Sequence, residues 1–363
     1  MKILTVAELQ GQKERAGAAA LSSRVTVVGS GTTFQVPKGD LLLMSALAQG
    51  VDYPHNCRVG TCGTCKTRLL KGRISPLVDF ALSPLTNEEL ENGYILACQS
   101  KVRTDLEIDV KLGTGHRDLP VRSVAGHVCA WRRLPGEVVD LRLRLDAPLM
   151  FAAGQYGILA PSGSFVQRSY SFYDAPPDPA GSGAQEVGFL VRRLPGGKFS
   201  AWVYGADLKG AKLWLQAPMG TMGFDEFDRD GLCVAGGTGL APILSIVSHR
   251  LKQSATARFT IVFGSRSAQD NFADALLANL LERESQRVRL VNILSNEPTG
   301  SAWRGRRGLV TDALDAALGV DYANAAAFVC GSLPMVEAVE KKLLQLGVDP
   351  DRVHADKFVP AAY

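Results

Sequence analysis

Short runs of alternating apolar and polar residues dominate the first third of the chain. Val25 to Val28 and Thr33 to Val36 have the two-residue period of half-buried strands. Leu41 to Ala48 has apolar residues at helical spacing, and apolar residues alternate with charged ones from Leu106 to Val110. This pattern predicts a small α+β unit over residues 23–112.

Two segments carry no periodic pattern. We expect residues 1–22 to be an N-terminal extension, because they are rich in alanine and charge and contain no motif. Residues 113–121 include Gly113, Gly115 and Pro120, which interrupt regular structure. They predict a linker between the first unit and the rest of the chain.

Strict alternation returns after the linker. Val138 to Leu145 alternates apolar and polar residues, and turn-forming clusters such as Ala175 to Gly183 separate further short strands. Short strands joined by such turns are typical of an antiparallel barrel. The pattern predicts a β-barrel domain over residues 122–226.

Residues 227–363 follow a different rhythm. Leu232 to Ala235 is a continuous apolar run typical of a buried strand, and glycines and a helical stretch to Leu251 follow it. Strands that alternate with helices predict a parallel α/β sheet. Further strands are predicted at Phe259–Phe263, Val288–Leu294 and Ala327–Cys330, and helices at Phe272–Glu284, Thr311–Leu318 and Met335–Leu346.

Composition excludes several classes of protein. The 363 residues exceed the size at which one hydrophobic core usually keeps growing, so two or three domains are expected. The formal net charge of +4, without a long basic run, gives no indication of nucleic-acid binding. Glu8, Lys13 and Arg15 interrupt the N-terminus before a signal-peptide core can form, and no apolar stretch is long enough to span a membrane. A cytoplasmic protein is therefore expected.

The seven cysteines do not form the even framework of a secreted, disulfide-rich domain. Cys129 and Cys233 lack cysteine neighbours, and we expect packing roles for both. The plant-type [2Fe-2S] spacing, C-x4-C-x2-C with a distant fourth cysteine, is formed by Cys57, Cys62, Cys65 and Cys98. Zinc sites usually arrange their ligands as two close pairs, but a zinc site or four unrelated buried cysteines remain alternatives.

The run from His55 to Cys65 resembles the ferredoxin domain fused to the reductases of bacterial aromatic-ring oxygenases, such as those serving benzoate dioxygenase and xylene monooxygenase. This resemblance implies a β-grasp fold for the first unit. Gly60 and Gly63 fit it, because a loop that aims backbone N–H groups at cluster sulfurs needs a flexible backbone.

The run from Arg168 to Ser171 matches the R-x-Y-S motif of the ferredoxin-NADP reductase superfamily. The resemblance implies an FAD site in the barrel. There Arg168 grips the pyrophosphate, Tyr170 stacks on the isoalloxazine and Ser171 forms a hydrogen bond near its reactive nitrogen. Four residues alone also fit an ordinary strand whose arginine faces solvent.

Pro195 to Ser200 resembles the second flavin segment of the same superfamily, and Gly154 to Tyr156 resembles the strand that leads into the site. The resemblance implies that Gly197 and Ser200 contact the flavin pyrophosphate, with Ser200 capping the helix that follows. An ordinary turn and helix cap remain the alternative.

Gly236 to Pro242 lies between a predicted strand and a helix, where glycines let dinucleotide phosphates approach the helix N-terminus. The run is not G-x-G-x-x-G, and it resembles the G-G-T-G-x-A-P segment of the reductase superfamily instead. Cys330 to Met335 repeats this arrangement, and the resemblance places Cys330 beside the nicotinamide carbon that gives up hydride. The candidates for nucleotide binding are Gly236, Gly237, Thr238, Gly239, Pro242 and Gly331.

The superfamily often ends with an acidic residue, one spacer and an aromatic ring that covers the flavin. Asp356, Lys357 and Phe358 have this spacing. Asp356 is therefore a candidate for a proton or orientation role, and Phe358 for the covering ring. Because the chain continues to Tyr363, that residue is a second candidate for the ring.

The choice between NADH and NADPH depends on contacts at the ribose 2′ position. Ser265 and Arg266 favour a phosphate there, whereas Asp270 favours a free hydroxyl. The resemblance favours NADH.

Together, the resemblances imply an oxidoreductase that passes electrons from NADH through FAD and a [2Fe-2S] cluster to a partner oxygenase. A nicotinamide delivers two electrons as hydride and a cluster accepts one at a time, so a flavin is required between them. Three alternatives stay open: a reductase for a deoxysugar dehydratase, a redox sensor that holds cluster and flavin without turnover, and a zinc-stabilised interaction protein.

Residues 23–112 contain ten Lys or Arg and nine Asp or Glu, so no strong net charge steers a partner from a distance. We expect a weak, transient contact with the oxygenase near the cluster loop, around Arg58 and Val59.

Overall fold

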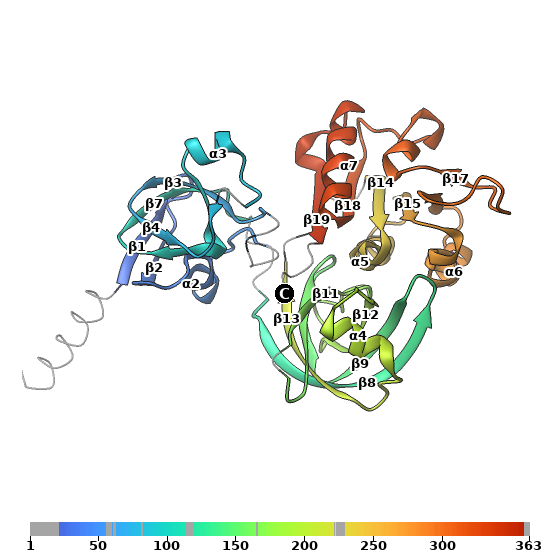
Figure 1. Cartoon of the computed structure of the whole chain (residues 1–363), viewed down its shortest axis with the longest axis horizontal. Helices are drawn as coiled ribbons and strands as arrows, with labels where there is room; N and C mark the ends of the chain where they lie inside the picture. Colours follow the sequence, from blue (N-terminus) through green and yellow to red (C-terminus); the bar gives the residue numbers. More distant parts are fainter. Residues whose placement is uncertain are drawn as a thin grey trace, which may run out of the picture. The chain divides into compact units, whose positions relative to one another are not determined.

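The structure, a computed structural model, forms two units, one up to Asp118 and one from Leu119 to Pro360 (Figure 1). In the part of the chain that is described, no helix combines the length and the apolar character needed to cross a membrane. The described residues are 22–55, 60, 63–80, 83–113, 119–164, 166–220, 222 and 229–358.

The first unit is built on a mixed five-stranded sheet with the order β2-β1-β7-β3-β5. The first strand pairs with the last in parallel, and helix α2 packs against the sheet through buried residues such as Leu42 and Ala46. This arrangement confirms the predicted β-grasp fold. The bounds are β1 Ser22–Val27, β2 Thr33–Pro37, α2 Leu42–Ala48, β3 Lys66–Lys71, β5 Tyr94–Leu96 and β7 Leu106–Asp109.

Smaller elements complete this unit. Strands β4 and β6 form a second, antiparallel sheet of two strands. In the sequence, Cys98 lies between these two strands, just before β6. Their bounds, with those of helix α3 and the 3-10 turn η2, are β4 Ile74–Pro76, α3 Asn87–Glu91, η2 Ala97–Gln99 and β6 Ser100–Val102.

The second unit begins with six antiparallel strands in the order β11-β10-β13-β8-β9-β12. A bridge between Phe172, just after the edge strand β11, and Phe189, in the middle of the other edge strand β12, closes the sheet on itself as the predicted barrel. The bounds are β8 Arg122–Leu134, β9 Val138–Leu149, β10 Tyr156–Pro161, β11 Arg168–Ser171, β12 Ala184–Arg192, α4 Lys198–Gly205 and β13 Lys212–Met219.

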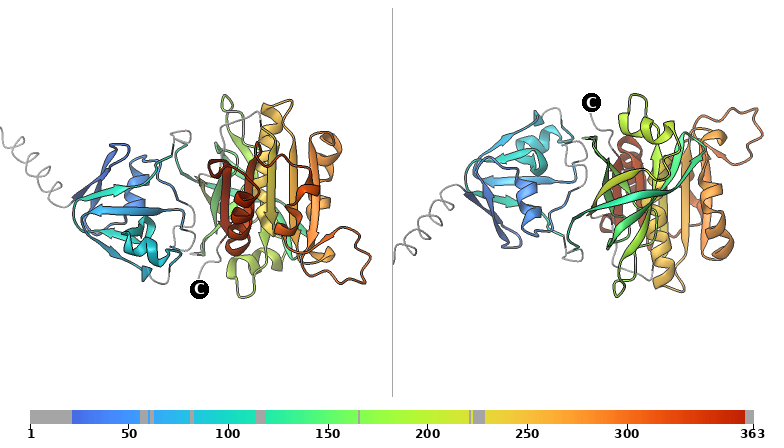
Figure 2. Two further views of the ribbon diagram at one scale, coloured as in Figure 1. Left: turned by 90° about the horizontal axis from the view of Figure 1, so that it is seen from above. Right: turned by 90° about the horizontal axis from the view of Figure 1, so that it is seen from below.

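A parallel sheet with the order β17-β16-β15-β14-β18-β19 forms the rest of this unit. Helices α5 and α6 cover one face, whereas α7 and two 3-10 turns cover the other (Figure 2). The strand bounds are β14 Gly231–Gly236, β15 Phe259–Ser265, β16 Val288–Leu294, β17 Arg306–Arg307, β18 Ala326–Ser332 and β19 Val353–Phe358. The helix bounds are η3 Gly237–Gly239, α5 Leu240–Gln253, η4 Ala268–Asp270, α6 Ala273–Arg283, η5 Val310–Ala313, η6 Ala316–Leu318, α7 Leu333–Gln345 and η7 Pro350–Arg352.

One predicted helix is wrong. The segment Thr311–Leu318 forms the turns η5 and η6 in place of a continuous α-helix. The carboxylate of Asp315 accepts a hydrogen bond from the Leu318 backbone, and Gly319 follows with φ of 64°. This local capping ends each turn before an α-helix can propagate.

The barrel and the parallel sheet share one hydrophobic core. Leu134, Val138 and Leu190 of the barrel belong to the same buried cluster as Leu240 and Phe263. The barrel and the parallel-sheet domain therefore pack directly against each other within the second unit. A site between them rests on this shared core.

Candidate functional site

Two of the four predicted cluster ligands lie together at one end of the first unit. Cys65 and Cys98 are buried, and neither forms a disulfide. The Ala97 backbone N–H donates to the Cys65 carbonyl at 3.2 Å, so the two cysteine-bearing segments are adjacent. Cys57 and Cys62 lie outside the described residues, as do Arg58 and Val59.

Gln99 links the loop to Cys98. A β-carbon at Gly60, where φ is +83°, would stand 2.8 Å from Gln99 Cγ, so only glycine fits this close approach. The Gln99 amide Nε2 donates to the Cys98 carbonyl at 3.0 Å and points at Cys98 Sγ at 3.7 Å. An amide donor aimed at a buried sulfur stabilises a thiolate, which fits the ligands of an iron-sulfur cluster.

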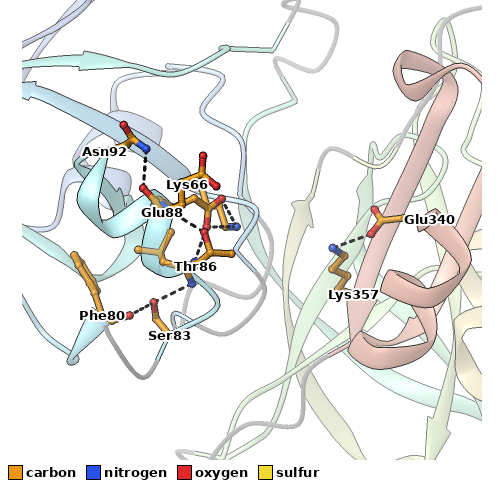
Figure 3. A network of polar contacts seen from close by, with 10 residues as sticks. Lys66, Phe80, Ser83, Thr86, Glu88, Asn92, Glu340 and Lys357 are labelled. Carbon is orange, nitrogen blue, oxygen red and sulfur yellow. Dashed lines mark hydrogen bonds and ion pairs between the residues drawn. The ribbon is translucent and has the colours of Figure 1, made fainter. Parts of the chain in front are cut away.

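An ion pair supports the chain immediately after Cys65. Lys66 Nζ lies 2.7 Å from Glu89 Oε1, and Glu89 also forms a capping box with Thr86 at the start of α3 (Figure 3). Partial burial favours the neutral acid, but hydrogen bonds from Lys66 and Thr86 outweigh it and hold the pKa of Glu89 below its ordinary value. The network fixes Lys66 against the cysteine segment on the side of Gly63, whose β-carbon would lie 3.1 Å from Lys66 Cε.

The R-x-Y-S segment forms β11, the edge strand that pairs with β10. Arg168 donates to the Gln167 carbonyl at 2.7 Å, and no described carboxylate pairs with its guanidinium. The ring of Tyr170 lies 5.4 Å from that of Phe199, and Ser171 is 5% exposed. The strand therefore carries one cation without a described acidic partner beside an aromatic cluster, which suits an anionic, aromatic ligand.

Gln155 holds the turn that leads into this strand pair. Its side chain accepts from the Ala152 N–H at 2.7 Å and donates to the Gly220 carbonyl at 3.1 Å. A β-carbon at Gly154, where φ is +78°, would overlap the Met222 carbonyl oxygen at 2.1 Å. The turn is thus fixed on both sides.

A polar network anchors the chain just after β11. Tyr173 donates to Asp140 at 2.7 Å, while Arg142 donates to both Tyr173 and Asp174. Burial raises the pKa of Asp174 despite the charge of Arg142 beside it. Gly188 leaves room for the Tyr173 ring, since a β-carbon there would stand 2.3 Å from Tyr173 Cζ.

The second flavin segment departs from the prediction in one respect. Helix α4 begins at Lys198 with Gly197 at its N-cap, so the predicted cap role of Ser200 is wrong. The Ser200 hydroxyl accepts from the Leu194 N–H at 3.1 Å and donates to the Gly197 carbonyl at 3.2 Å. Ser200 therefore holds the loop before the helix, while the first backbone N–H groups of α4 stay available to an anion.

A cavity of about 340 Å³ lies at the carboxyl ends of β14, β15 and β16. This edge of a parallel sheet is where nucleotides bind in open α/β folds. The barrel contributes Gly136, Val138 and Arg192 to its wall. The parallel sheet and its loops contribute Gly237, Gly264, Ser265, Arg266, Asp270, Ser295, Pro334 and Met335, among others.

The glycines beside this cavity are required by close packing. A β-carbon at Gly239 would stand 2.3 Å from the Cys330 carbonyl oxygen. At Gly236 and Gly331 it would stand 2.4 and 2.7 Å from the sulfur of Met335. The two predicted nucleotide segments therefore lie backbone to backbone, with half-buried Thr238 on their turn and buried Pro242 in the first turn of α5.

Strand pairing brings the C-terminal candidates to the same place. Cys330 is directly opposite Asp356, and Ser332 is opposite Phe358. Burial, followed by the charge of Asp356, raises the pKa of the Cys330 thiol well above its ordinary value. Burial therefore favours the neutral thiol, which is a poor nucleophile.

Phe358 packs half-buried against the shared core. The preceding Lys357 pairs with Glu340 of α7 at 2.9 Å and fastens β19 to that helix (Figure 3). Tyr363 lies outside the described residues, so the choice between the two rings stays a prediction.

Arg192 is a candidate that the sequence analysis missed. It ends β12 of the barrel, yet its Nη1 atom would lie 3.6 Å from a β-carbon at Gly237. Among the described residues its guanidinium has neither a hydrogen bond nor an ion pair. The only sequence signal is a basic residue that ends a barrel strand just before Pro195, and the contact itself needs the packing of both domains.

The predicted determinants of the 2′ position meet in the cavity. Ser265, Arg266 and Asp270 all line it. Asp270 Oδ2 accepts from Ser267 at 2.9 Å, and the Asp270 backbone lies 2.8 Å from where a β-carbon of Gly136 would stand. The barrel hairpin thus holds the acidic residue in position.

The two isolated cysteines differ in burial. Cys233 is fully buried within β14, where burial raises its pKa to about 12. Cys129 is half-buried on β8. A neutral, enclosed thiol behaves as a small apolar side chain, in line with the predicted packing role of Cys233.

Comparisons with known proteins agree with this geometry. Residues 25–103 match the family of 2Fe-2S iron-sulfur cluster binding domains, and residues 233–341 match the oxidoreductase NAD-binding domain. The chain is 38% identical over 337 residues to the xylene/toluene monooxygenase electron transfer component XylA of Pseudomonas putida, with 93% of each chain covered. It is 32% identical to the reductase component of the naphthalene 1,2-dioxygenase system of Pseudomonas putida, over 89% of this chain and 94% of that one.

Solved structures give the same result. The ferredoxin reductase in carbazole 1,9a-dioxygenase has a TM-score of 0.72 and 28% identity, with 93% of this chain and 98% of that chain covered. The Amycolatopsis cytochrome P450 reductase GcoB has a TM-score of 0.78 and 29% identity, over 94% of this chain and all of that one. The likeness therefore extends over both units of the fold.

Proposed function

The chain belongs to the family of ferredoxin-containing reductase components of oxygenase systems, and we propose that it delivers electrons from NADH to the oxygenase of such a system. It is an oxidoreductase whose cofactors are a [2Fe-2S] cluster, FAD and NAD(H). The cluster-binding match decides against the zinc alternative.

One observation carries the proposal. The cavity at the edge of the parallel sheet is walled in part by Gly136 and Arg192 of the barrel. A dinucleotide held there by Gly237 would lie against the barrel, the domain that carries the R-x-Y-S strand. When bound, the flavin accepts two electrons together and releases them singly, which neither NADH nor a [2Fe-2S] cluster can do.

On the flavin side, Arg168 grips the pyrophosphate, Tyr170 lies against the ring system and Ser171 donates near its reactive nitrogen. Arg168 is supported in this role by the lack of a described carboxylate partner, and Tyr170 by its place beside Phe199. Gly197 presents the first N–H groups of α4 to the phosphates, and Ser200 keeps the loop in shape.

On the nicotinamide side, the glycine turn before α5 lets the pyrophosphate approach the backbone, and Arg192 neutralises its charge. Cys330 and Gly331 form the floor under the nicotinamide, with Asp356 behind the thiol. Phe358 is the candidate for the ring that would cover the flavin, with Tyr363 as the alternative. The residues of the turn are Gly236, Gly237, Thr238, Gly239 and Pro242.

We assign NADH as the preferred donor because Asp270 lines the cavity, where its carboxylate would repel a 2′-phosphate and accept from a 2′-hydroxyl. The domains that follow from these roles are residues 23–112 for the cluster, 122–226 for FAD and 227–363 for NADH. They are preceded by residues 1–22 and joined by the linker 113–121. Electrons leave near the cluster loop through a transient contact with the oxygenase.

The test is a visible spectrum of the purified protein before and after NADH is added without oxygen. We expect bands of both flavin and iron-sulfur cluster, and bleaching of both by NADH. A preparation without iron contradicts the proposal, as does a flavin that stays oxidised with excess NADH. Rapid NADH-dependent reduction of a one-electron acceptor excludes a sensor without turnover.

A further inference from the structure

The two-stranded sheet of β4 and β6 lies next to the segment that carries Cys98. The Leu77 N–H, just after β4, donates to the Gln99 carbonyl at 2.8 Å. The amide of the same Gln99 points at Cys98 Sγ at 3.7 Å. Leu77 is thus connected to a cluster ligand through a single intervening residue.

Leu77 and Val78 are exposed apolar neighbours at this position. Their exposed fractions are 50% and 39%, although the unit has a well-filled core of its own. Isolated exposed apolar residues are ordinary, but an adjacent pair beside a redox ligand is a candidate for contact with another protein. Electron transfer between proteins uses small, short-lived interfaces.

Three cations lie along the small sheet that ends at this apolar pair. Arg73 and Arg103 flank the small sheet, and Lys101 lies on β6 opposite Ser75. Within the described residues none of the three forms an ion pair. Two acidic residues are nearby: Asp79 directly follows Val78, and Asp105 accepts from the Arg24 backbone N–H at 2.8 Å.

We propose that this surface, the exit face formed by Arg73, Leu77, Val78, Lys101 and Arg103, docks the protein that accepts electrons from the cluster. The inference rests on the proposed function and specifies its partner. The partner presents an apolar patch with carboxylates along one side of it, because these complement the pair of apolar residues and the three cations beside it. In the step that follows, one electron leaves the reduced cluster and the partner's metal centre is reduced by one electron, with no bond made or broken.

Two haem proteins of opposite charge serve as probes: acidic cytochrome b5 and basic cytochrome c. The Arg73 side chain has no described partner, so Arg73→Glu is compatible with the fold. We expect this variant to reduce cytochrome b5 about tenfold more slowly at low salt, with a weaker salt dependence, while cytochrome c reduction is unchanged or faster. Arg283→Glu on α6 changes the net charge equally and is expected to leave both rates as in the parent protein.

The apolar part is tested separately. Leu77→Ser is expected to slow cytochrome b5 reduction severalfold, whereas Leu70→Ser, a matched change at a residue 42% exposed on β3, is not. Bleaching of flavin and cluster by NADH alone must stay at the parent rate in each variant. Slower internal bleaching would mean that the face serves contact within the chain, and it would overturn the proposal.

The outcomes separate the two proposals. If the parent protein passes no electrons from NADH to either cytochrome, the proposed function fails and the docking proposal with it. If the parent reduces both and Arg73→Glu reduces cytochrome b5 at the parent rate, only the exit face is wrong. An equal loss toward both cytochromes also overturns the exit face, because a charge-selective surface cannot produce it.

Discussion

The backbone of Gly239 lies against the carbonyl of Cys330, so closely that a β-carbon at position 239 would stand 2.3 Å from that oxygen. Ninety residues of sequence separate the two, yet both belong to the same turn region at the edge of the sheet. This contact joins the turn proposed to bind phosphate to the residue proposed to lie beside the nicotinamide.

Gly239→Ala is therefore expected to push the two segments apart. We expect the KM for NADH to rise about tenfold or more, which corresponds to about 1.4 kcal/mol or more. Steady-state kinetics would measure this KM. The FAD and iron contents of the variant should stay close to those of the parent. Gly300→Ala, where a β-carbon meets nothing within 4 Å, is the control and should change neither value. A parent-like KM for Gly239→Ala would contradict the packing argument.

Arg192→Met removes the barrel cation beside Gly237. A charge-assisted hydrogen bond contributes about 1.5–3 kcal/mol, so kcat/KM for NADH should fall about 10- to 100-fold while flavin binding is retained. The neighbouring Arg193 pairs with Glu137 at the surface instead. Arg193→Met should have little effect, and equal losses in both variants would argue against a specific role for Arg192.

Arg168→Lys keeps the charge but loses the planar fork that grips a pyrophosphate. The apoprotein should bind FAD about tenfold more weakly, measured by titration of flavin fluorescence. Arg144 on β9 is exposed and pairs with Glu186, so Arg144→Lys provides a matched change elsewhere on the barrel. Unchanged FAD affinity in Arg168→Lys would favour the surface-strand interpretation.

Cys98→Ser replaces a predicted cluster ligand by a poor one. We expect the protein to lose most of its iron, with NADH still bleaching the flavin and cytochrome c reduction nearly abolished. Cys129→Ser, on the barrel, should keep its iron and its activity. Iron retained in Cys98→Ser would remove that residue from the ligand set.

Asp270→Asn removes a negative charge but keeps an acceptor for Ser267. The ratio of kcat/KM values for NADH over NADPH should fall about tenfold, because the 2′-phosphate no longer meets a like charge. Glu297 caps the same loop by accepting from the Ala268 N–H at 2.8 Å without lining the cavity. Glu297→Gln should leave the ratio as it is, and an equal shift in both variants would assign the effect to the loop as a whole.

The sequence predicted the parts of the fold that depend on local pattern. The alternation of Val138 to Leu145 and the apolar run at Leu232 to Ala235 both became strands, because a core lies on one or both of their faces. Strand β19 was not predicted, since its run from Val353 to Phe358 lacks an apolar pattern and is held mainly by pairing with β18.

The site residues also divide into those that the sequence predicts and those that only the folded structure brings to the site. The glycines at 236, 237 and 239 were visible as a motif, whereas Arg192 becomes a candidate only when the barrel packs on the parallel sheet. The capping role expected of Ser200 failed because helix α4 begins three residues earlier than a cap at that position requires. Contacts made across domains leave no periodic signal in one sequence.

The shared core of the second unit bears on how such reductases can be recombined. Leu134, Val138 and Leu190 are buried among residues of β14, β15 and α5, whereas the boundary at residues 118 and 119 separates two units with cores of their own. A chimera spliced at that boundary leaves both cores whole. A chimera spliced near residue 227 would expose apolar side chains of the shared core to water. Exchanging the ferredoxin unit alone is thus the simplest way for one NADH-oxidising unit to serve a different electron acceptor.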